Sequence, residues 1–295
     1  LATPWQVALT RSKMINKSAL GKGIILDCAC GSGIQLAAHA AHLQRAALGI
    51  ELDSQRALAS AVNLQTIAHS MDQHDSQRMN DTRVLCGDGR DGKGALESLQ
   101  QNLELSQMPE IALLHLDPAR PRNSREHGLE EMAPRLDEIF TGWKPFLSEG
   151  KRGPSLLLDL SPRLSHQQRL QVESMVDSVW PQIGRTWVWT SRGRGRVDRL
   201  ALWLGSISIP NVARRYVRIP PNLQDEPLII DGGESIQSGD GIPQKSRRPP
   251  RKGERVSLLD AALVESGLAN VWLNSVTKSE EIHWGVVGGR RPQIH

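Results

Sequence analysis

Residues 24–33 have the sequence Ile-Ile-Leu-Asp-Cys-Ala-Cys-Gly-Ser-Gly, and the rest of the chain can be placed around them. The short apolar run ends in Asp27, and Gly31 and Gly33 allow the backbone to turn sharply and to approach a ligand closely. An amphipathic helical pattern over residues 34–43 follows. This order predicts a strand, a tight loop and a helix, which is the unit that binds nucleotides in α/β domains.

An acidic residue follows at the spacing that such a unit requires. A second apolar run over residues 46–50 leads to Glu51, twenty residues after Gly31. In nucleotide-binding α/β units this position binds the ribose hydroxyls. A dinucleotide fingerprint also needs a third glycine, but Gln35 and Leu36 follow Gly33. The sequence therefore favours a nucleoside ligand and argues against a nicotinamide oxidoreductase.

Three further strands are expected at residues 83–86, 111–116 and 155–160. Ligands of open α/β sheets bind at the carboxyl ends of the strands, so the residues after each strand are site candidates. Asp88 and Gly89 follow the strand at residues 83–86, and Asp117-Pro118-Ala119-Arg120 follows the strand at residues 111–116. His115 interrupts the apolar run of the second strand, and we expect it to be a core or lining residue rather than a catalyst.

The pattern changes after residue 185. Residues 186–190 and 197–205 predict a hairpin whose tip carries Arg192, Arg194 and Arg196, and its tryptophans are expected to pack in the sheet. Composition shifts after residue 208, and residues 245–255 form a basic connector ahead of a helix predicted at 258–268. The predicted domains are an N-terminal helical segment (1–22), an α/β domain (23–208) and a small α+β domain (209–295).

Composition narrows the class of protein. The 295 residues carry a net charge of +4, which fits a polyanionic partner. The sequence has neither a signal peptide nor an apolar run approaching the roughly 20 residues of a membrane span, so we expect a soluble, cytoplasmic protein with no membrane partner. Its three cysteines form no C-x-x-C pair, so no metal site is predicted and all three are expected to be buried. Because the sequence begins at Leu1, we expect a fragment or a processed product.

Together these motifs resemble the class I S-adenosylmethionine-dependent methyltransferases, and among them a family of predicted RNA methyltransferases with a THUMP-like C-terminal domain. The pattern D-x-x-x-G-x-G at residues 27–33 is similar to their motif I. The other matching segments are Ala2-Thr3-Pro4, Asp117-Pro118-Ala119-Arg120, Leu160-Ser161-Pro162 and Ala201-Leu202-Trp203-Leu204-Gly205. The resemblance implies a Rossmann-like, seven-stranded sheet, S-adenosylmethionine as cofactor and tRNA or rRNA as substrate. Pro121 and Asp159 depart from it, since basic residues are expected at both positions.

The resemblance also implies roles for individual residues. The cofactor-binding residues are expected to be Asp27, Ala29, Cys30, Gly31, Gly33, Glu51, Leu52, Asp88 and Gly89. Glu51 would bind the ribose, Asp27 and the loop backbone the methionine portion, and Asp88 the adenine. The expected catalytic residues are Asp117, Pro118 and Arg120, with Asp117 holding or deprotonating the acceptor. Arg120 stands where many base-amine methyltransferases have a stacking aromatic residue, and no cysteine lies near Asp117 for a covalent carbon-5 mechanism.

Three functions of different classes remain open from the sequence. They are an RNA methyltransferase, a methyltransferase of protein or small molecules, and a non-catalytic RNA-binding module. Titration with the cofactor separates an enzyme from a module. Salt-sensitive retention on RNA separates the first function from the second, because phosphate contacts release counterions.

Overall fold

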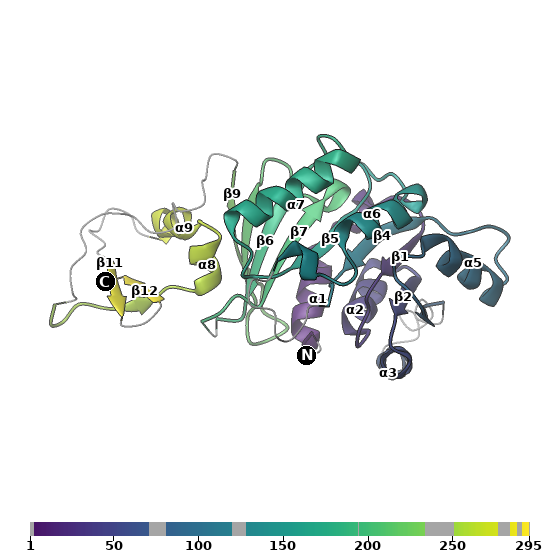
Figure 1. Cartoon of the computed structure of the whole chain (residues 1–295). Helices are drawn as coiled ribbons and strands as arrows, with labels where there is room; N and C mark the ends of the chain where they lie inside the picture. Colours follow the sequence, from purple (N-terminus) through teal and green to yellow (C-terminus); the bar gives the residue numbers. More distant parts are fainter. Residues whose placement is uncertain are drawn as a thin grey trace. The chain divides into compact units, whose positions relative to one another are not determined.

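The structure is a computed structural model, and it describes residues 3–70, 81–119, 128–193, 195–233, 251–276, 284–287 and 291–294. The chain forms two compact units. Figure 1 shows its helices and strands, coloured along the sequence. The first comprises residues 1–185 with 202–208, and the second comprises residues 186–201 with 209–295. Among the described residues, no helix has both the length and the apolar character needed to cross a membrane.

The first unit alternates strands and helices along the chain. Its amino-terminal elements are α1 (Trp5–Lys13), η1 (Lys17–Ala19), β1 (Ile24–Asp27), α2 (Ile34–Leu43), β2 (Ala47–Glu51) and α3 (Ser54–His69). They are followed by β3 (Arg83–Cys86), α5 (Gly92–Asn102), β4 (Ile111–Leu116), η2 (Leu129–Glu131), α6 (Leu136–Trp143), η3 (Lys144–Phe146), β5 (Leu156–Leu160) and α7 (His166–Val179). This alternation is what a parallel sheet requires, because each crossover needs a connection long enough to span the sheet.

The helices of this unit pack in two groups. Helix α1 packs on α2 and α2 on α3, whereas α6 packs on both α5 and α7. In Figure 1, α1 and α2 lie below the strands β1, β4 and β5, and α6 and α7 lie above them. Both faces of these strands are therefore covered, which explains why every residue of β4 and of β5 is buried.

The principal sheet has the strand order β3-β2-β1-β4-β5-β7-β6-β8-β9. Strands β1, β2, β3, β4 and β5 pair in parallel, and in that register Asp27 lies opposite His115. The expected Rossmann-like α/β fold is confirmed. The expected count of seven strands is wrong, because β8 pairs with β6 and β9 pairs with β8, which extends the sheet to nine strands.

The second unit contains the remaining strands and two short helices. Strands β6 (Arg185–Ser191) and β7 (Arg199–Leu204) are divided between the two units, and η4 (Gly205–Ile207) belongs to the first. The other elements of the second unit are β8 (Arg214–Arg218), β9 (Leu228–Gly232), β10 (Ser257–Leu258), α8 (Ala261–Glu265), α9 (Ala269–Val276), β11 (Trp284–Val287) and β12 (Arg291–Ile294). Strands β6 and β8 are parallel, β8 and β9 are antiparallel, and β10, β12 and β11 form a small separate sheet. As predicted, Trp187, Trp189 and Trp203 are buried.

Of the helix predicted at residues 258–268, only residues 261–265 are helical, as α8; Leu258 belongs to β10, and the next helix, α9, begins at Ala269. Gly267 has a φ of +77° between them, a left-handed conformation that ends a helix. The predicted boundary between residues 208 and 209 stays a prediction, and so does the likeness of residues 209–295 to a THUMP domain.

Candidate functional site

The loop between β1 and α2 is built around two glycines in left-handed conformations. Gly31 has a φ of +53° and Gly33 a φ of +72°. A side chain at Gly33 would meet the Ser60 hydroxyl at 2.3 Å, whereas the space beside Gly31 is open except for one carbonyl oxygen 3.9 Å away. The loop is closed from within by a hydrogen bond of 2.8 Å from Gly33 N–H to the Cys30 carbonyl. We call residues 28–33 the β1 loop.

Glu51 ends β2 and joins this strand to the β1 loop. Its carboxylate accepts hydrogen bonds from the N–H groups of Gly31 and Asp53, both at 3.1 Å. The next side chain, Leu52, is 76% exposed. An anchored carboxylate is thus followed by an apolar side chain that is open to solvent.

The loop after β3 approaches the β1 loop closely. A Cβ atom on Gly89 would lie 2.0 Å from the Cys28 carbonyl oxygen, so only glycine fits there. The Gly89 carbonyl accepts a hydrogen bond of 2.7 Å from the Trp143 indole. Gly87, by contrast, has no atom within 4 Å of a built Cβ. The residues after β1, β2 and β3 are therefore brought together, as the sequence predicts.

Asp88 lies in the same loop, partly exposed and held by Arg90. Two hydrogen bonds, of 2.9 Å from Nε and 2.6 Å from Nη2, join the guanidinium to the carboxylate. These bonds lower the pKa of Asp88, and Arg90 also contacts Glu138 of α6 at 3.0 Å. Asp88 is therefore ionised and held in place.

The residues after β4 form the predicted catalytic segment. Asp117 is half-buried at the carboxyl end of β4, and Pro118 is buried. Ala119 is fixed by two hydrogen bonds with Ala133, of 2.9 and 3.0 Å. Arg120, the third predicted catalytic residue, lies outside the described residues.

Asp27 is buried rather than open to solvent. One carboxylate oxygen accepts from the Ala29 N–H at 3.2 Å, and the other lies 2.7 Å from His115 Nδ1. The side chain is 2% exposed, and His115, as predicted, is a core residue, at 1%. In this arrangement Asp27 holds the β1 loop from beneath.

A chain of buried polar contacts continues from His115 to helix α1. His115 Nε2 lies 3.1 Å from the Asp159 carboxylate, which also pairs with the Arg11 guanidinium. Arg11 donates a further hydrogen bond of 3.0 Å to Gln35 of α2. We call Arg11, Asp27, His115 and Asp159 the buried charge cluster. Asp159, where a basic residue was expected, receives its basic partner from α1 instead.

The protonation of this cluster follows from its contacts. Burial by itself lowers the pKa of His115, but the Asp27 charge and the hydrogen bonds with Asp159 and Asp27 outweigh it and raise the pKa to about 9. His39, edge-on to His115 at 5.5 Å between ring centroids, has a pKa well below its usual value because it is buried and near cations. The cluster thus holds two cations and two anions beside a neutral imidazole.

The cysteines differ from one another. Cys28 and Cys30 are buried, and burial followed by the Asp27 charge raises the pKa of Cys30 to about 12, so this thiol is un-ionised. Cys86 is exposed, contrary to the prediction. It lies in β3, the edge strand of the sheet, where a side chain has a neighbouring strand on one side only. No group of three or more metal-ligating side chains is found within the described parts of the chain.

In the second unit, the arginines of the hairpin tip are not equivalent. Arg192 pairs with Asp198 at 2.7 Å and is 19% exposed, whereas Arg196 is 66% exposed and only 3.9 Å from the same carboxylate. Burial raises the pKa of Asp198, but the Arg192 hydrogen bonds outweigh it, so the net shift is downward. The side chain of Arg194 lies outside the described residues.

Two hollows of about 640 and 670 Å³ lie elsewhere in the first unit. One borders residues 20–23 ahead of β1, and the other borders residues 152–154 ahead of β5. Both are at the amino ends of strands. We place the candidate site at the opposite edge, because ligands of open α/β sheets bind at the carboxyl ends.

The sequence did not indicate Arg11, Gln35 or His39 as parts of the site. Arg11 and Asp159 are 148 residues apart, and neither belongs to a short motif. The signal that the sequence did contain is a polar residue inside each of two apolar strands, His115 in β4 and Asp159 in β5. Buried polar side chains of this kind require hydrogen-bond partners.

Comparison with known proteins supports the fold. No protein-family model and no curated protein matches this sequence. Among solved structures, a candidate methyltransferase from Porphyromonas gingivalis W83 is 18% identical, with a TM-score of 0.55. The match covers 93% of this chain and 57% of the P. gingivalis chain. Two other structures have lower TM-scores. A candidate class I S-adenosylmethionine-dependent methyltransferase from Listeria monocytogenes has 14% identity and a TM-score of 0.49, and the match covers 76% of this chain and 67% of that one. A candidate rRNA methylase from Clostridium thermocellum has 9% identity and a TM-score of 0.41, and the match covers 70% of this chain and 99% of that one. The chain spans little more than half of the P. gingivalis protein, and it shares its Rossmann-like fold.

Proposed function

We propose that this protein is an S-adenosylmethionine-dependent methyltransferase that acts on RNA, either tRNA or rRNA, in the cytoplasm. The observation that carries the proposal is the bond from Gly31 N–H to Glu51, which closes the β1 loop against β2 beside the exposed Leu52. In a Rossmann-like sheet this is the place for a nucleoside, with its ribose on the acid. The missing third glycine of the dinucleotide pattern favours a cofactor without a pyrophosphate.

The residues present fit such a cofactor. The open space beside Gly31 and Gly87 leaves two backbone segments accessible at the same edge of the sheet. Leu52 offers an apolar surface for a base, and the Glu51 carboxylate can accept from ribose hydroxyls while keeping its bonds to the backbone. When bound, S-adenosylmethionine supplies an electrophilic methyl group on a positively charged sulfur.

We assign the binding roles in this way. Glu51 and Leu52 contact the ribose and base, and Asp88 with Gly89 borders the adenine. The backbone of Ala29, Cys30, Gly31 and Gly33 holds the methionine portion. Asp27, whose two oxygens already bond His115 and Ala29, fixes this backbone from below.

Asp117 and Pro118 act on the acceptor. Asp117 stands at the carboxyl end of the central strand β4, where it can orient the acceptor or take its proton. Pro118 and the bonded pair Ala119 and Ala133 fix the backbone that carries it. We assign Arg120 to phosphate or to the edge of a base.

RNA is the proposed acceptor because of charge and family likeness. The net charge is +4, and the exposed Arg196 at the hairpin tip offers a phosphate contact. The motifs D-P-A-R and A-L-W-L-G resemble those of predicted RNA methyltransferases with a THUMP-like C-terminal domain, and we extend that assignment to residues 209–295.

The test is incubation with labelled S-adenosylmethionine and total unmodified RNA, followed by mass spectrometry of the nucleosides. We expect a labelled, methylated nucleoside that depends on active protein. Cofactor binding with no labelled nucleoside would contradict RNA as the acceptor and direct the search to protein or small molecules. Absence of cofactor binding would contradict the methyltransferase assignment itself.

A further inference from the structure

Apart from Asp27, the buried charge cluster has no part in the roles assigned above, although Asp27 joins it directly to the β1 loop. Asp27, His115 and Asp159 come from three adjacent strands, β1, β4 and β5, and Arg11 comes from α1. All four side chains are at most 2% exposed. Burying four ionisable groups is costly, and the cost is offset only when each has its partners.

The contacts of His115 place a carboxyl group at each of its ring nitrogens. Each ring nitrogen faces a carboxylate, Nδ1 toward Asp27 at 2.7 Å and Nε2 toward Asp159 at 3.1 Å. When both carboxylates are ionised they only accept hydrogen bonds, so both nitrogens donate and the ring is an imidazolium, in agreement with the raised pKa of His115. Its charge, with that of Arg11, balances the two carboxylates.

His115 is joined to the β1 loop by backbone as well as side chain. Its carbonyl accepts from Cys28 N–H at 3.1 Å, and its imidazolium holds the Asp27 carboxylate that accepts from Ala29 N–H. Two consecutive N–H groups at the start of the loop are thus positioned through one residue of β4. Asp159 and Arg11 hold the far side of the ring.

We propose that His115 is a positioning residue for cofactor binding: held between Asp159 and Asp27, it fixes the conformation of the β1 loop, with Arg11 of helix α1 locking the assembly. The inference rests on the proposed function in one respect, that the ligand of this loop is the cofactor. The order of the loop itself is independent of that function and can be measured without the cofactor.

Two substitutions separate the two sides of the ring. In His115→Asn the amide nitrogen replaces Nδ1 and keeps a donor toward Asp27, whereas in His115→Gln it replaces Nε2 and keeps a donor toward Asp159. His39→Gln is the matched control, because His39 is equally buried and adjacent but bonds Ser12 and Gln35. The readouts are calorimetric affinity for S-adenosylhomocysteine, hydrogen exchange of the peptide spanning residues 28–33, and thermal unfolding of each variant.

We expect His115→Gln to weaken binding by about tenfold or more and to speed exchange of the loop, while His115→Asn and the control stay within about threefold of wild type. Equal losses in the Asn and Gln variants, in proportion to their losses of thermal stability, would overturn the inference. So would unchanged exchange and affinity in His115→Gln. If the wild-type protein binds no cofactor, the proposed function fails, and loop exchange alone decides the inference.

The pH profile gives a second test that needs only the Asn variant. The groups facing His115 are Asp27 from β1, Asp159 from β5, Arg11 from α1 and the neutral His39 from α2. Loss of the imidazolium proton at high pH should loosen the loop, so wild-type affinity should fall relative to His115→Asn above about pH 9. Titration of the cofactor is common to both proteins and cancels in their ratio. Parallel profiles would contradict the proposal.

Discussion

The N–H of Gly31 donates a hydrogen bond of 3.1 Å to the carboxylate of Glu51, twenty residues further along the chain. This bond ties the loop after β1 to the end of the neighbouring strand β2. It leaves the remaining lone pairs of the carboxylate free to accept from a ligand. One residue therefore both shapes the loop and contributes a binding group.

Glu51→Ala should fold but lose affinity for S-adenosylmethionine. Hydrogen bonds to charged groups contribute about 1.5 to 3 kcal/mol each, so the loss should be at least tenfold. Calorimetric titration measures it, with Glu97→Gln on the exposed side of α5 as the control. Affinity within twofold of wild type would remove Glu51 from the site.

Asp117→Ala should retain cofactor affinity while turnover falls by on the order of a hundredfold or more, since orientation or proton transfer is lost. Single-turnover methylation of RNA measures the rate, and calorimetry checks the affinity. Near-normal turnover would show that Asp117 has a structural role alone.

Gly89→Ala should destabilise the protein because its Cβ would lie 2.0 Å from the Cys28 carbonyl oxygen. Overpacking of this kind typically costs about 1 to 3 kcal/mol. Gly87→Ala, two residues earlier in a space with no atom within 4 Å, is the matched control and should be tolerated. Urea unfolding compares the two, and equal stabilities would mean that the loops separate easily.

The His115 contribution to stability should decline as the pH rises. Its pKa is about 9 in the folded protein against 6.5 for an ordinary histidine. A raised folded pKa means that the stabilisation is complete below about pH 6.5, declines between 6.5 and 9, and is lost above 9. The shift corresponds to at most about 3 kcal/mol. The difference in unfolding free energy between wild type and His115→Asn should therefore shrink across this range, and a constant difference would contradict the assignment.

The local parts of this fold could be predicted, and the long-range parts could not. The strand, turn and helix around Asp27 follow from apolar runs and glycines that lie next to each other in sequence. Helix α5 escaped prediction because Gly92 and Gly94 weaken its first turn, although Asp91 caps it with a 2.9 Å bond. The pairing of Arg11 with Asp159 depends on packing across the sheet, for which the sequence holds no local signal. The addition of β8 and β9 to the sheet likewise depends on which strand edge they meet.

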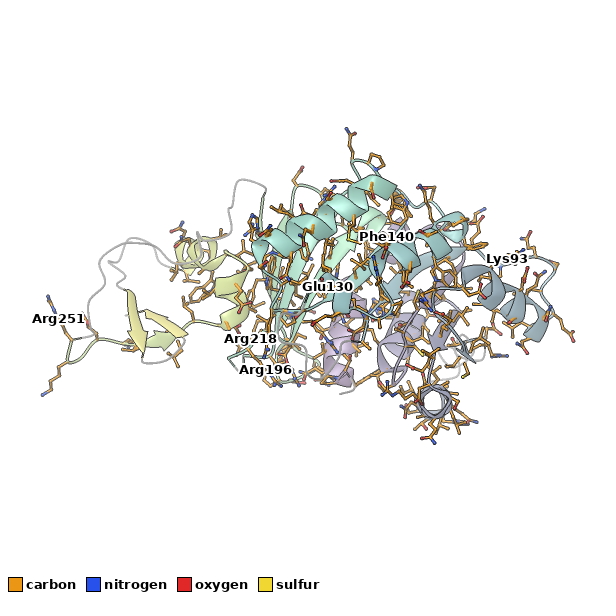
Figure 2. The ribbon with its side chains drawn as sticks, viewed as in Figure 1. Lys93, Glu130, Phe140, Arg196, Arg218 and Arg251 are labelled. Carbon is orange, nitrogen blue, oxygen red and sulfur yellow. The ribbon has the colours of Figure 1, made fainter. Side chains whose placement is uncertain are left out.

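The hairpin tip offers a prediction in which neighbouring arginines behave differently. Arg192 is a structural side chain, because it pairs with Asp198, whose side chain is only 6% exposed. Arg196 is exposed at the same tip, whereas Arg218 at the end of β8 pairs at 2.8 Å with Asp260, whose side chain is only 5% exposed; both arginines are labelled in Figure 2. Of these three side chains, Arg196 is therefore the one available to phosphate.

Arg196→Ser should therefore weaken RNA binding and reduce the slope of log affinity against log salt by about 0.7, the value of one phosphate contact on a single strand. Its stability and cofactor affinity should match wild type. Arg192→Ser should instead lower stability, because it leaves the Asp198 carboxylate without its main partner. Affinities measured from low to moderate salt for both variants give the comparison. If Arg196→Ser and wild type have the same slope, the tip does not contact nucleic acid, and RNA as the substrate would rest on net charge and family likeness alone.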